Sequence, residues 1–228
     1  IVHRSTNMNW YQGSTLMYHL ETLHISSDYN HIDCRFPVQS VIRPHTLDNQ
    51  DFRGFAGRID GGVFKPGDRV KTLPSGFVTT IKTIELNGEQ IAEAFAPMSV
   101  TMTLQDEIDT SRGDMIVREN NVPEIGQDLE ILVTWMSSNP LQALTKVVIK
   151  HTTNQCMAMV KELKYKIDIN TLHRLQDIDT LAMNDIGRVS IRTAKPLFYD
   201  VYKKNRQTGS LIIIDEQTNE TIGAGMII

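Results

Sequence analysis

The most chemically suggestive group in this 228-residue chain is an acidic cluster of Asp106, Glu107 and Asp109. Three neighbouring carboxylates could bind a cation or act as acid and base. Arg112 and Gly113 follow them, however, between two segments that have the composition of strands, and loops commonly carry such charges. A solvated turn is therefore the favoured interpretation.

The histidines are also poorly arranged for a metal site. His19 and His24 are the only close pair among seven, and a spacing of five residues places them on different faces of the helix expected there. The chain lacks H-x-H, H-E-x-x-H and C-x-x-C. Cys34 and Cys156 lie in strand-like segments of different predicted domains, so we expect buried free thiols rather than a disulfide.

Enzymatic motifs are absent as well. A GTPase needs a loop that cradles phosphates, and neither G-x-x-x-x-G-K-[ST] nor the guanine-reading N-K-x-D occurs. Residues 51–54 spell D-x-x-G, the form of a switch motif that senses the γ-phosphate, but no phosphate loop precedes it. No serine, cysteine or lysine lies in a recognisable nucleophile context. The sequence predicts no catalytic, cofactor-binding or metal-binding residue, and this chain alone should not hydrolyse GTP.

Three residues are candidates for an interface instead. In the segment 51–55, D-F-R-G-F, Arg53 lies between Phe52 and Phe55, a composition that can make a compact docking patch. The alternative, in which one phenylalanine enters the core and Arg53 is solvated, is equally open. Trp135 poses a similar question, with core packing favoured over docking.

Strand-like stretches separated by turn residues must position these side chains. Six of them precede residue 120, at 34–42, 52–59, 69–73, 77–86, 99–104 and 114–117; six follow, at 127–135, 145–149, 155–165, 188–193, 211–214 and 220–226. This pattern predicts an all-β fold of two successive six-stranded barrels. Residues 170–175 and 177–181 are expected to form short helical turns or a loop excursion. A polar run that contains Tyr199, Asp200, Tyr202, Asn205 and Thr208 is expected to form a hairpin and its supports rather than a site.

A helix is expected ahead of the barrels. Ser14 or Thr15 can cap it, and Leu16, Leu20 and Leu23 then share one face. That apolar face should pack on a domain that is missing, so we expect the sequence to be a fragment.

Two polar segments divide the chain. Residues 26–30 read as a linker, and the proline-containing segment 119–124 is the best boundary between the barrels. We predict a tail and linker at 1–27, a first barrel at 28–120 and a second at 121–228. The short linkers 26–31 and 119–123 are expected to let the barrels move as bodies.

Several motifs resemble one family. Residues 51–70, D-F-R-G-F-A-G-R-I-D-G-G-V-F-K-P-G-D-R-V, resemble the second domain of the translation-factor GTPases. Residues 196–227 carry D-V-Y-K-K-N-R-Q-T-G and T-N-E-T-I-G-A-G-M, which resemble the closing segment of the GTP-dependent large subunit of bacterial sulfate adenylyltransferase. The segments R-F-P-V-Q at 35–39, D-E-I-D-T-S-R-G-D at 106–114 and Y-K-I-D-I-N at 165–170 agree in order and spacing. W-Y-Q-G-S-T-L at 10–16 resembles the exit of the GTPase domain.

The resemblance implies barrels of the elongation-factor type, preceded by a helix left from the GTPase domain. The intact family enzyme makes adenylyl sulfate and pyrophosphate from ATP and sulfate and couples this to GTP hydrolysis, with GTP and Mg in the missing domain. Its partners would be the small subunit and its own GTPase domain. The barrels would transmit or dock without catalysing. Whether the full chain continues into an adenylylsulfate kinase stays open.

Two rival functions remain. A tRNA-delivering translation factor fits the first barrel but not T-N-E-T-I-G-A-G-M, and an independent ligand-binding barrel leaves residues 10–23 unexplained. A net charge of -4 argues mildly against nonspecific nucleic-acid binding. No apolar run approaches the roughly 20 residues that cross a bilayer. We expect a cytoplasmic protein with no membrane or nucleic-acid partner.

Overall fold

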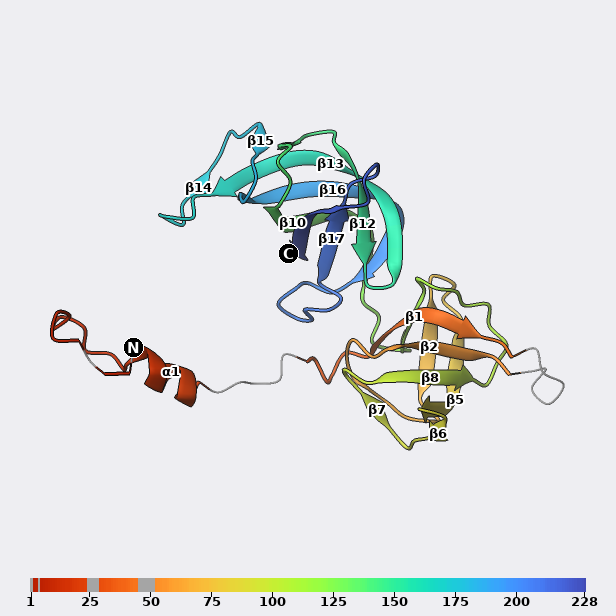
Figure 1. The fold of residues 1–228 in the computed structure, drawn as a ribbon. Helices are drawn as coiled ribbons and strands as arrows, with labels where there is room; N and C mark the ends of the chain where they lie inside the picture. The colour runs from red at the N-terminus through yellow and green to blue at the C-terminus, as the bar shows by residue number, and fades with distance from the viewer. Residues whose placement is uncertain (1, 4, 24–28, 45–51) are drawn as a thin grey trace.

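The computed structural model describes residues 2, 3, 5–23, 29–44 and 52–228, and nearly all of its regular structure is β-strand. The long strands form two rings that follow one another along the chain, as Figure 1 shows. We call the rings barrel 1 and barrel 2. Because side chains alternate between the two faces of a strand, each ring encloses its own apolar core.

Barrel 1 closes through six antiparallel strands in the order β4-β9-β1-β2-β8-β5. The pairing of Arg69 with Thr80 and of Val70 with Thr79 joins β4 to β5 and completes the ring. The strands are β1 (Arg35–Ile42), β2 (Gly54–Arg58), β4 (Arg69–Leu73), β5 (Val78–Leu86), β8 (Ser99–Leu104) and β9 (Met115–Arg118).

Barrel 2 closes in the same way, in the order β12-β17-β18-β10-β16-β13, with β12 paired to β13. Its longest strands, β13 and β16, pair along most of their length. The strands are β10 (Glu124–Trp135), β12 (Lys146–His151), β13 (Asn154–Ile167), β16 (Ile186–Tyr199), β17 (Ser210–Ile214) and β18 (Thr221–Ile227).

Short strands decorate the rings. They are β3 (Val63–Phe64), β6 (Glu89–Gln90), β7 (Ala94–Phe95), β11 (Leu141–Gln142), β14 (Arg174–Leu175) and β15 (Thr180–Leu181). The loop excursion expected around residues 170–181 therefore contains two short strands, β14 on the edge of β13 and β15 paired with β11. It begins with a single helical turn, in which the Leu172 amide donates to the Asp168 carbonyl at 2.7 Å.

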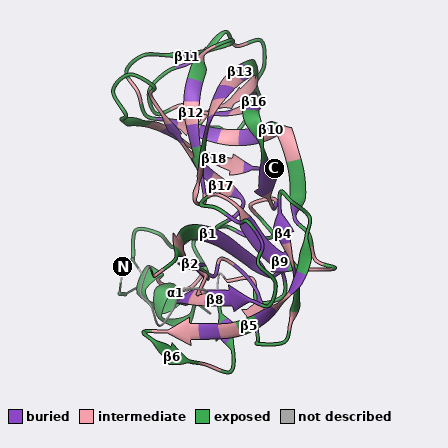
Figure 2. Cartoon of the chain, turned by 90° about the vertical axis from the view of Figure 1, so that its right-hand side faces the viewer, coloured by how far each residue is buried: buried purple, intermediate pink, exposed green. Residues whose placement is uncertain are grey.

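The sequence-based prediction of two six-stranded barrels is confirmed, since each predicted stretch overlaps one strand of a ring. Figure 2 shows buried residues running along the strands of both rings. Cys34 and Cys156 are both free and buried, as predicted, and burial raises the pKa of each thiol. A thiol with a raised pKa is a poor nucleophile at neutral pH.

The predicted helix is α1 (Leu16–Thr22), and Thr15 caps it by accepting a hydrogen bond from the Tyr18 amide at 3.3 Å. All of its residues are exposed, Leu16 and Leu20 included (Figure 2). Of the linker that follows, residues 26–28 lie outside the described residues, as does His24. Within the part of the chain that the structure describes, no helix has the length and hydropathy needed to span a membrane.

Candidate functional site at the junction of the two barrels

Two sequence motifs that lie far apart along the chain meet between the barrels. Arg35 begins β1 in barrel 1, and Asp200 directly follows β16 in barrel 2. Arg35 donates from Nε to Asp200 Oδ2 at 2.8 Å and from Nη2 to Oδ1 at 2.9 Å. The two side chains are 0% and 2% exposed. This is a fully buried, two-pronged ion pair across the junction.

The remaining polar atoms of the pair are also satisfied. Arg35 Nη1 donates to the Asn121 carbonyl at 2.6 Å and to Asn121 Oδ1 at 2.8 Å, and Thr208 Oγ1 donates to Asp200 Oδ2 at 2.8 Å. Burial alone would raise the pKa of Asp200, but hydrogen bonds and charge from Arg35, with Thr208 and Lys204, outweigh it and lower that pKa. The buried charges are therefore held in their ionised forms, which such a pair requires.

A second layer of polar contacts surrounds the ion pair. Asp33 accepts from Asn121 Nδ2 and from Asn30 Nδ2, both at 2.7 Å, and Lys204 Nζ lies 3.2 Å from Asp33 Oδ1. Asn30 Nδ2 also reaches the Lys204 carbonyl at 3.1 Å. Burial works to raise the pKa of Asp33, and its bonds to Asn121, Asn30 and Lys204 leave it lowered.

The segment 119–123 is thus tied down where the sequence predicted a free linker. Asn121 bonds to Arg35 and Asp33 with its side chain, and its Oδ1 accepts from the Cys34 amide at 3.1 Å. A rotation about this segment would have to break the buried network. The structure therefore argues against a hinge between the barrels.

His151 extends the network into barrel 2. It ends β12, is buried, and its Nε2 lies 2.7 Å from the Thr208 carbonyl oxygen. Burial lowers the pKa of His151, although the Thr208 carbonyl and the charge of Asp200 oppose that shift. The imidazole is accordingly neutral at neutral pH and donates to the carbonyl.

Two adjacent glycines allow close packing at the junction, Gly61 against both barrels and Gly62 against Cys34 of barrel 1. A Cβ on Gly61 would lie 2.5 Å from the Asp33 carbonyl oxygen and 2.8 Å from Asn205 Nδ2. Gly62 has a φ of +75°, and a Cβ there would lie 2.5 Å from the Cys34 Cα. Next to them, Asn205 Nδ2 donates to the Asp60 carbonyl at 3.0 Å. No other residue type would fit at either glycine without moving backbone.

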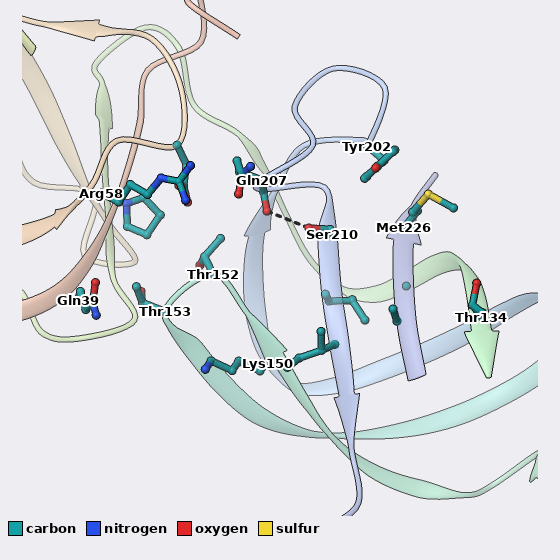
Figure 3. A pocket seen from close by; sticks show the side chains of 16 residues that line it. Gln39, Arg58, Thr134, Lys150, Thr152, Thr153, Tyr202, Gln207, Ser210 and Met226 are labelled. Carbon is teal, nitrogen blue, oxygen red and sulfur yellow. Dashed lines mark hydrogen bonds between the residues drawn. The ribbon is translucent and has the colours of Figure 1, made fainter. Parts of the chain in front are cut away.

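A cleft with a volume of about 650 Å³ lies beside this junction. Figure 3 shows Gln39 and Arg58 of barrel 1 facing Lys150, Thr152 and Thr153 of barrel 2 across it. Asp60 also lines the cleft, and burial raises its pKa to about 6, with Arg58 opposing the shift. The cleft is one place where polar groups of both barrels face solvent together.

The structure separates the three predicted interface residues. Arg53 is 20% exposed and donates to the Ile108 carbonyl at 2.7 Å and to Asp109 Oδ1 at 2.8 Å. Phe55 is 1% exposed and Trp135 is 2% exposed, so both rings are core residues, and Trp135 donates from Nε1 to the Asn139 carbonyl. Neither aromatic ring can dock a partner in this conformation, and docking by Arg53 stays a prediction. Asp51, the first residue of that predicted patch, lies outside the described residues.

The carboxylates of the acidic cluster at 106–109 face different parts of the protein. Asp106 accepts from Thr79 Oγ1 at 2.8 Å, whereas Asp109 faces Arg53. Among the residues that the structure describes, no group of three histidine, cysteine or acidic side chains could hold a metal ion. The junction between the barrels was not predicted from the sequence as a functional site. Most of its side chains nevertheless come from two of the motifs behind the family resemblance, at 35–39 and at 200–209.

Comparisons with known proteins agree with the fold and with those motifs. Residues 128–228 match the family model "GTP-eEF1A C-terminal domain-like". A solved structure of Sup35 with GDP superposes on 96% of this chain and 52% of its own with a TM-score of 0.77, at 15% identity. Elongation factor SelB of Methanococcus maripaludis gives a TM-score of 0.71 over 93% of this chain and 45% of its own, at 16% identity. These likenesses show the fold.

Sequence relatives are more specific. The bifunctional enzyme CysN/CysC of Mycobacterium tuberculosis is 47% identical over 100% of this chain and 37% of its own length. Sulfate adenylyltransferase subunit 1 of Bacteroides fragilis is 44% identical over 100% of this chain and 47% of its own. The chain thus spans about half or less of the length of these relatives. The resemblance predicted from the motifs is confirmed: the chain is homologous over its whole length to sulfate adenylyltransferase subunit 1, and it has the paired barrels of the translation-factor GTPases.

Proposed function

We propose that this chain is the two-barrel, non-catalytic part of a sulfate adenylyltransferase subunit 1. The intact protein would couple GTP hydrolysis, with Mg, to the formation of adenylyl sulfate and pyrophosphate from ATP and sulfate. The observation that carries the proposal is 44% identity to sulfate adenylyltransferase subunit 1 across the entire chain. Its partners would be a second subunit and its own GTPase domain, in the cytoplasm.

The junction supports a specific mechanical role for the barrels. Coupling requires two states whose interfaces differ, and a rigid element that carries the difference from one site to another. The buried pair of Arg35 and Asp200, with Asn121 bonded to Arg35, makes the two barrels one such element. Motion at one barrel would then be passed to the other without loss.

A direct assay tests the proposal. The intact subunit that contains this chain is combined with its second subunit, and pyrophosphate release from ATP and sulfate is measured with and without GTP. We expect sulfate-dependent release that GTP stimulates. GTP hydrolysis that responds to aminoacyl-tRNA and not to sulfate would instead identify a translation factor.

The Arg53→Ala variant then asks whether the predicted docking residue matters. We expect weaker stimulation by GTP while GTP binding is unchanged, because Arg53 lies outside the residues 10–23 that resemble the exit of a GTPase domain. Unaltered affinity for the second subunit together with full stimulation would place the docking surface elsewhere. Asp109→Asn, which removes the partner of Arg53 on the same surface, serves as the matched control.

A further inference from the structure

The chain enters barrel 1 through three consecutive residues, Tyr29, Asn30 and His31, which we call the entry segment (Figure 1). Tyr29 is half-buried and packs against the core of barrel 1. The His31 ring lies edge-on to the ring of Phe95 in β7, with the ring centroids 6.5 Å apart. The entry segment is therefore attached to barrel 1, although the sequence predicted a moving linker over 26–31.

Asn30 forms a turn with the main chain that follows it. Its Oδ1 accepts from the Ile32 amide at 2.9 Å and from the Asp33 amide at 3.0 Å. Asparagine side chains commonly bond to the main chain two residues further on in this way. The Asn30 carbonyl also accepts from the Gly62 amide at 2.7 Å. The main chain of barrel 1 thus fixes the position of Asn30, and its amino group is directed elsewhere.

The amino group of Asn30 contacts both barrels. Nδ2 lies 2.7 Å from Asp33 Oδ2 in barrel 1 and 3.1 Å from the Lys204 carbonyl oxygen in barrel 2. An amide nitrogen carries two hydrogens, so it donates one to each acceptor. The Lys204 side chain joins the same group, since its Nζ lies 3.2 Å from Asp33 Oδ1. One side chain of the entry segment therefore binds barrel 1 and barrel 2 together.

This contact differs from the rest of the junction in its place along the chain. Arg35 begins a strand of barrel 1 and Asn121 lies between the barrels, whereas Asn30 precedes both of them. A displacement of the chain ahead of residue 29 therefore acts on Asn30 before it acts on any strand. Because Asn30 is bonded to both barrels, such a displacement reaches barrel 2 directly and not only through barrel 1.

The bond between Asn30 and Lys204 is also easier to break than the buried ion pair. It lies at the exposed rim of the junction, where water can take the place of either partner. Arg35 and Asp200 are enclosed, and their separation would leave charges buried without partners. The rim bond can therefore open and close while the buried pair stays intact.

We propose that the entry segment is the anchor through which a movement of the preceding part of the chain is passed to both barrels, with Asn30 as the positioning residue. In one arrangement Asn30 is bonded to Lys204, and in the other the displaced entry segment gives up that bond and releases the loop 201–209. Two arrangements with different contacts are what transmission requires. The inference rests on the transmission role proposed above, whereas the contact itself does not.

Hydrogen exchange in the 228-residue chain tests the anchor. Asn30→Ser keeps an oxygen that can accept from the Ile32 amide, but it removes the amino group that bonds to Lys204. We expect the amides of the loop 201–209 to exchange about two- to tenfold faster in this variant, the range that corresponds to one lost hydrogen bond. The amides of this loop that report on it, because they donate within the loop, are those of Lys204, Asn205 and Gly209.

The intact subunit tests the transmission. In the assay of pyrophosphate release, Asn30→Ser should lower the stimulation by GTP, again by about two- to tenfold, while release without GTP stays at the wild-type rate. A loss of folded protein would lower both rates, so the ratio separates positioning from folding. Asn139→Ser, which changes an exposed asparagine in a bend of barrel 2, is the matched control and should alter neither exchange in the loop nor stimulation.

Each failure has a different signature. Unchanged exchange of the loop 201–209 in Asn30→Ser, or an equal change in Asn139→Ser, would overturn the anchor. Faster exchange together with full stimulation by GTP would overturn its part in transmission. A wild-type subunit without sulfate-dependent release would contradict the proposed function and the transmission with it, and exchange in the 228-residue chain would still decide whether Asn30 holds both barrels.

Discussion

Two arginine–aspartate pairs in this chain have the same shortest distance and very different surroundings. Arg35 and Asp200 join the barrels, whereas Arg53 and Asp109 join two segments at one end of barrel 1, and both pairs are closest at 2.8 Å. The first pair is 0% and 2% exposed; the second is 20% and 90% exposed. Water therefore competes for one pair and is excluded from the other.

The difference decides what each pair does. An exposed ion pair is screened by water and salt and adds little stability. A buried pair need not add stability compared with apolar residues, but losing one partner leaves an uncompensated charge in the interior. The buried pair thus fixes the arrangement of the barrels, whereas the exposed pair places little constraint on it, and docking of a partner by Arg53 stays our prediction.

The largest expected effect comes from breaking the buried pair. Arg35→Met leaves the buried Asp200 with only Lys204, a half-exposed side chain 3.5 Å away, as a nearby cation. We therefore expect a loss of about 3 to 5 kcal/mol in the free energy of unfolding, measured by urea denaturation. Arg35→Met with Asp200→Leu should restore part of that loss because no charge is left unpaired. A loss under about 1 kcal/mol in the single variant would contradict the comparison.

Asp60 extends the comparison to a carboxylate that forms no ion pair with any residue that the structure describes, although the charge of Arg58 acts on it. Its folded pKa of about 6 lies above the usual 3.8, so the ionised form opposes folding at neutral pH, and this cost disappears below about pH 4. Asp60→Asn should therefore stabilise the chain by about 1 to 2 kcal/mol at pH 7.5, allowing for partial exposure. Thermal unfolding at pH 7.5 and pH 4 checks this. A variant that is less stable at pH 7.5 would show that the carboxylate has a partner.

His151 should produce a fall in stability with acid. Its pKa is lowered by burial, so the unfolded chain takes up a proton first as the pH drops below about 6.5. The contribution of His151 to the free energy of unfolding is therefore complete above about pH 6.5 and is lost as the pH falls toward the lower pKa of the folded state. Asp60 has the opposite effect, since its contribution raises the stability as the pH falls from about 6 to about 4. Urea denaturation at a series of pH values is therefore measured in the Asp60→Asn variant. In that variant, His151→Gln should flatten the plot of the free energy of unfolding against pH below about pH 6.5. An unchanged slope would mean that another group causes the loss of stability.

The smallest effect is expected at the exposed pair. Arg53→Ala removes the contact with Asp109 and the bond to the Ile108 carbonyl, and should cost about 1 kcal/mol or less. Urea denaturation at low and at high salt measures it, and the cost should shrink with salt. A loss as large as that of Arg35→Met would mean that Arg53 is a structural residue and that its docking role should be abandoned.

Much of the fold could be predicted because strands and turns leave local patterns. Alternating apolar residues in β10 and the turn residues between β4 and β5 are visible within a few positions of each other. The junction left no such pattern, since Arg35 and Asp200 are 165 residues apart and each reads locally as a surface charge. Only the assembled barrels bring the two side chains together, with Asn121 bonded to Arg35.

The candidate interface could be predicted only in part, because local patterns indicate where Arg53 lies but not which way Phe55 and Trp135 face. The sequence indicates a polar residue at the end of a strand for Arg53, and the structure places it directly before β2. Phe55 and Trp135 could face either way on their strands, and which way they face depends on the register of β2 with β8 and of β10 with β18, which no single segment carries. A shift of one residue would turn each ring from the core to the surface.

The closing of both rings has a consequence for how a partner can bind. Each long strand of barrel 1 and barrel 2 has a hydrogen-bonded neighbour on both sides, because β4 pairs with β5 and β12 pairs with β13. An incoming peptide therefore cannot extend either ring as an added strand, and two copies cannot join edge to edge along these strands. Whatever binds here must recognise side chains and loops, so its specificity can be altered by surface substitutions that leave every backbone hydrogen bond of the barrels in place.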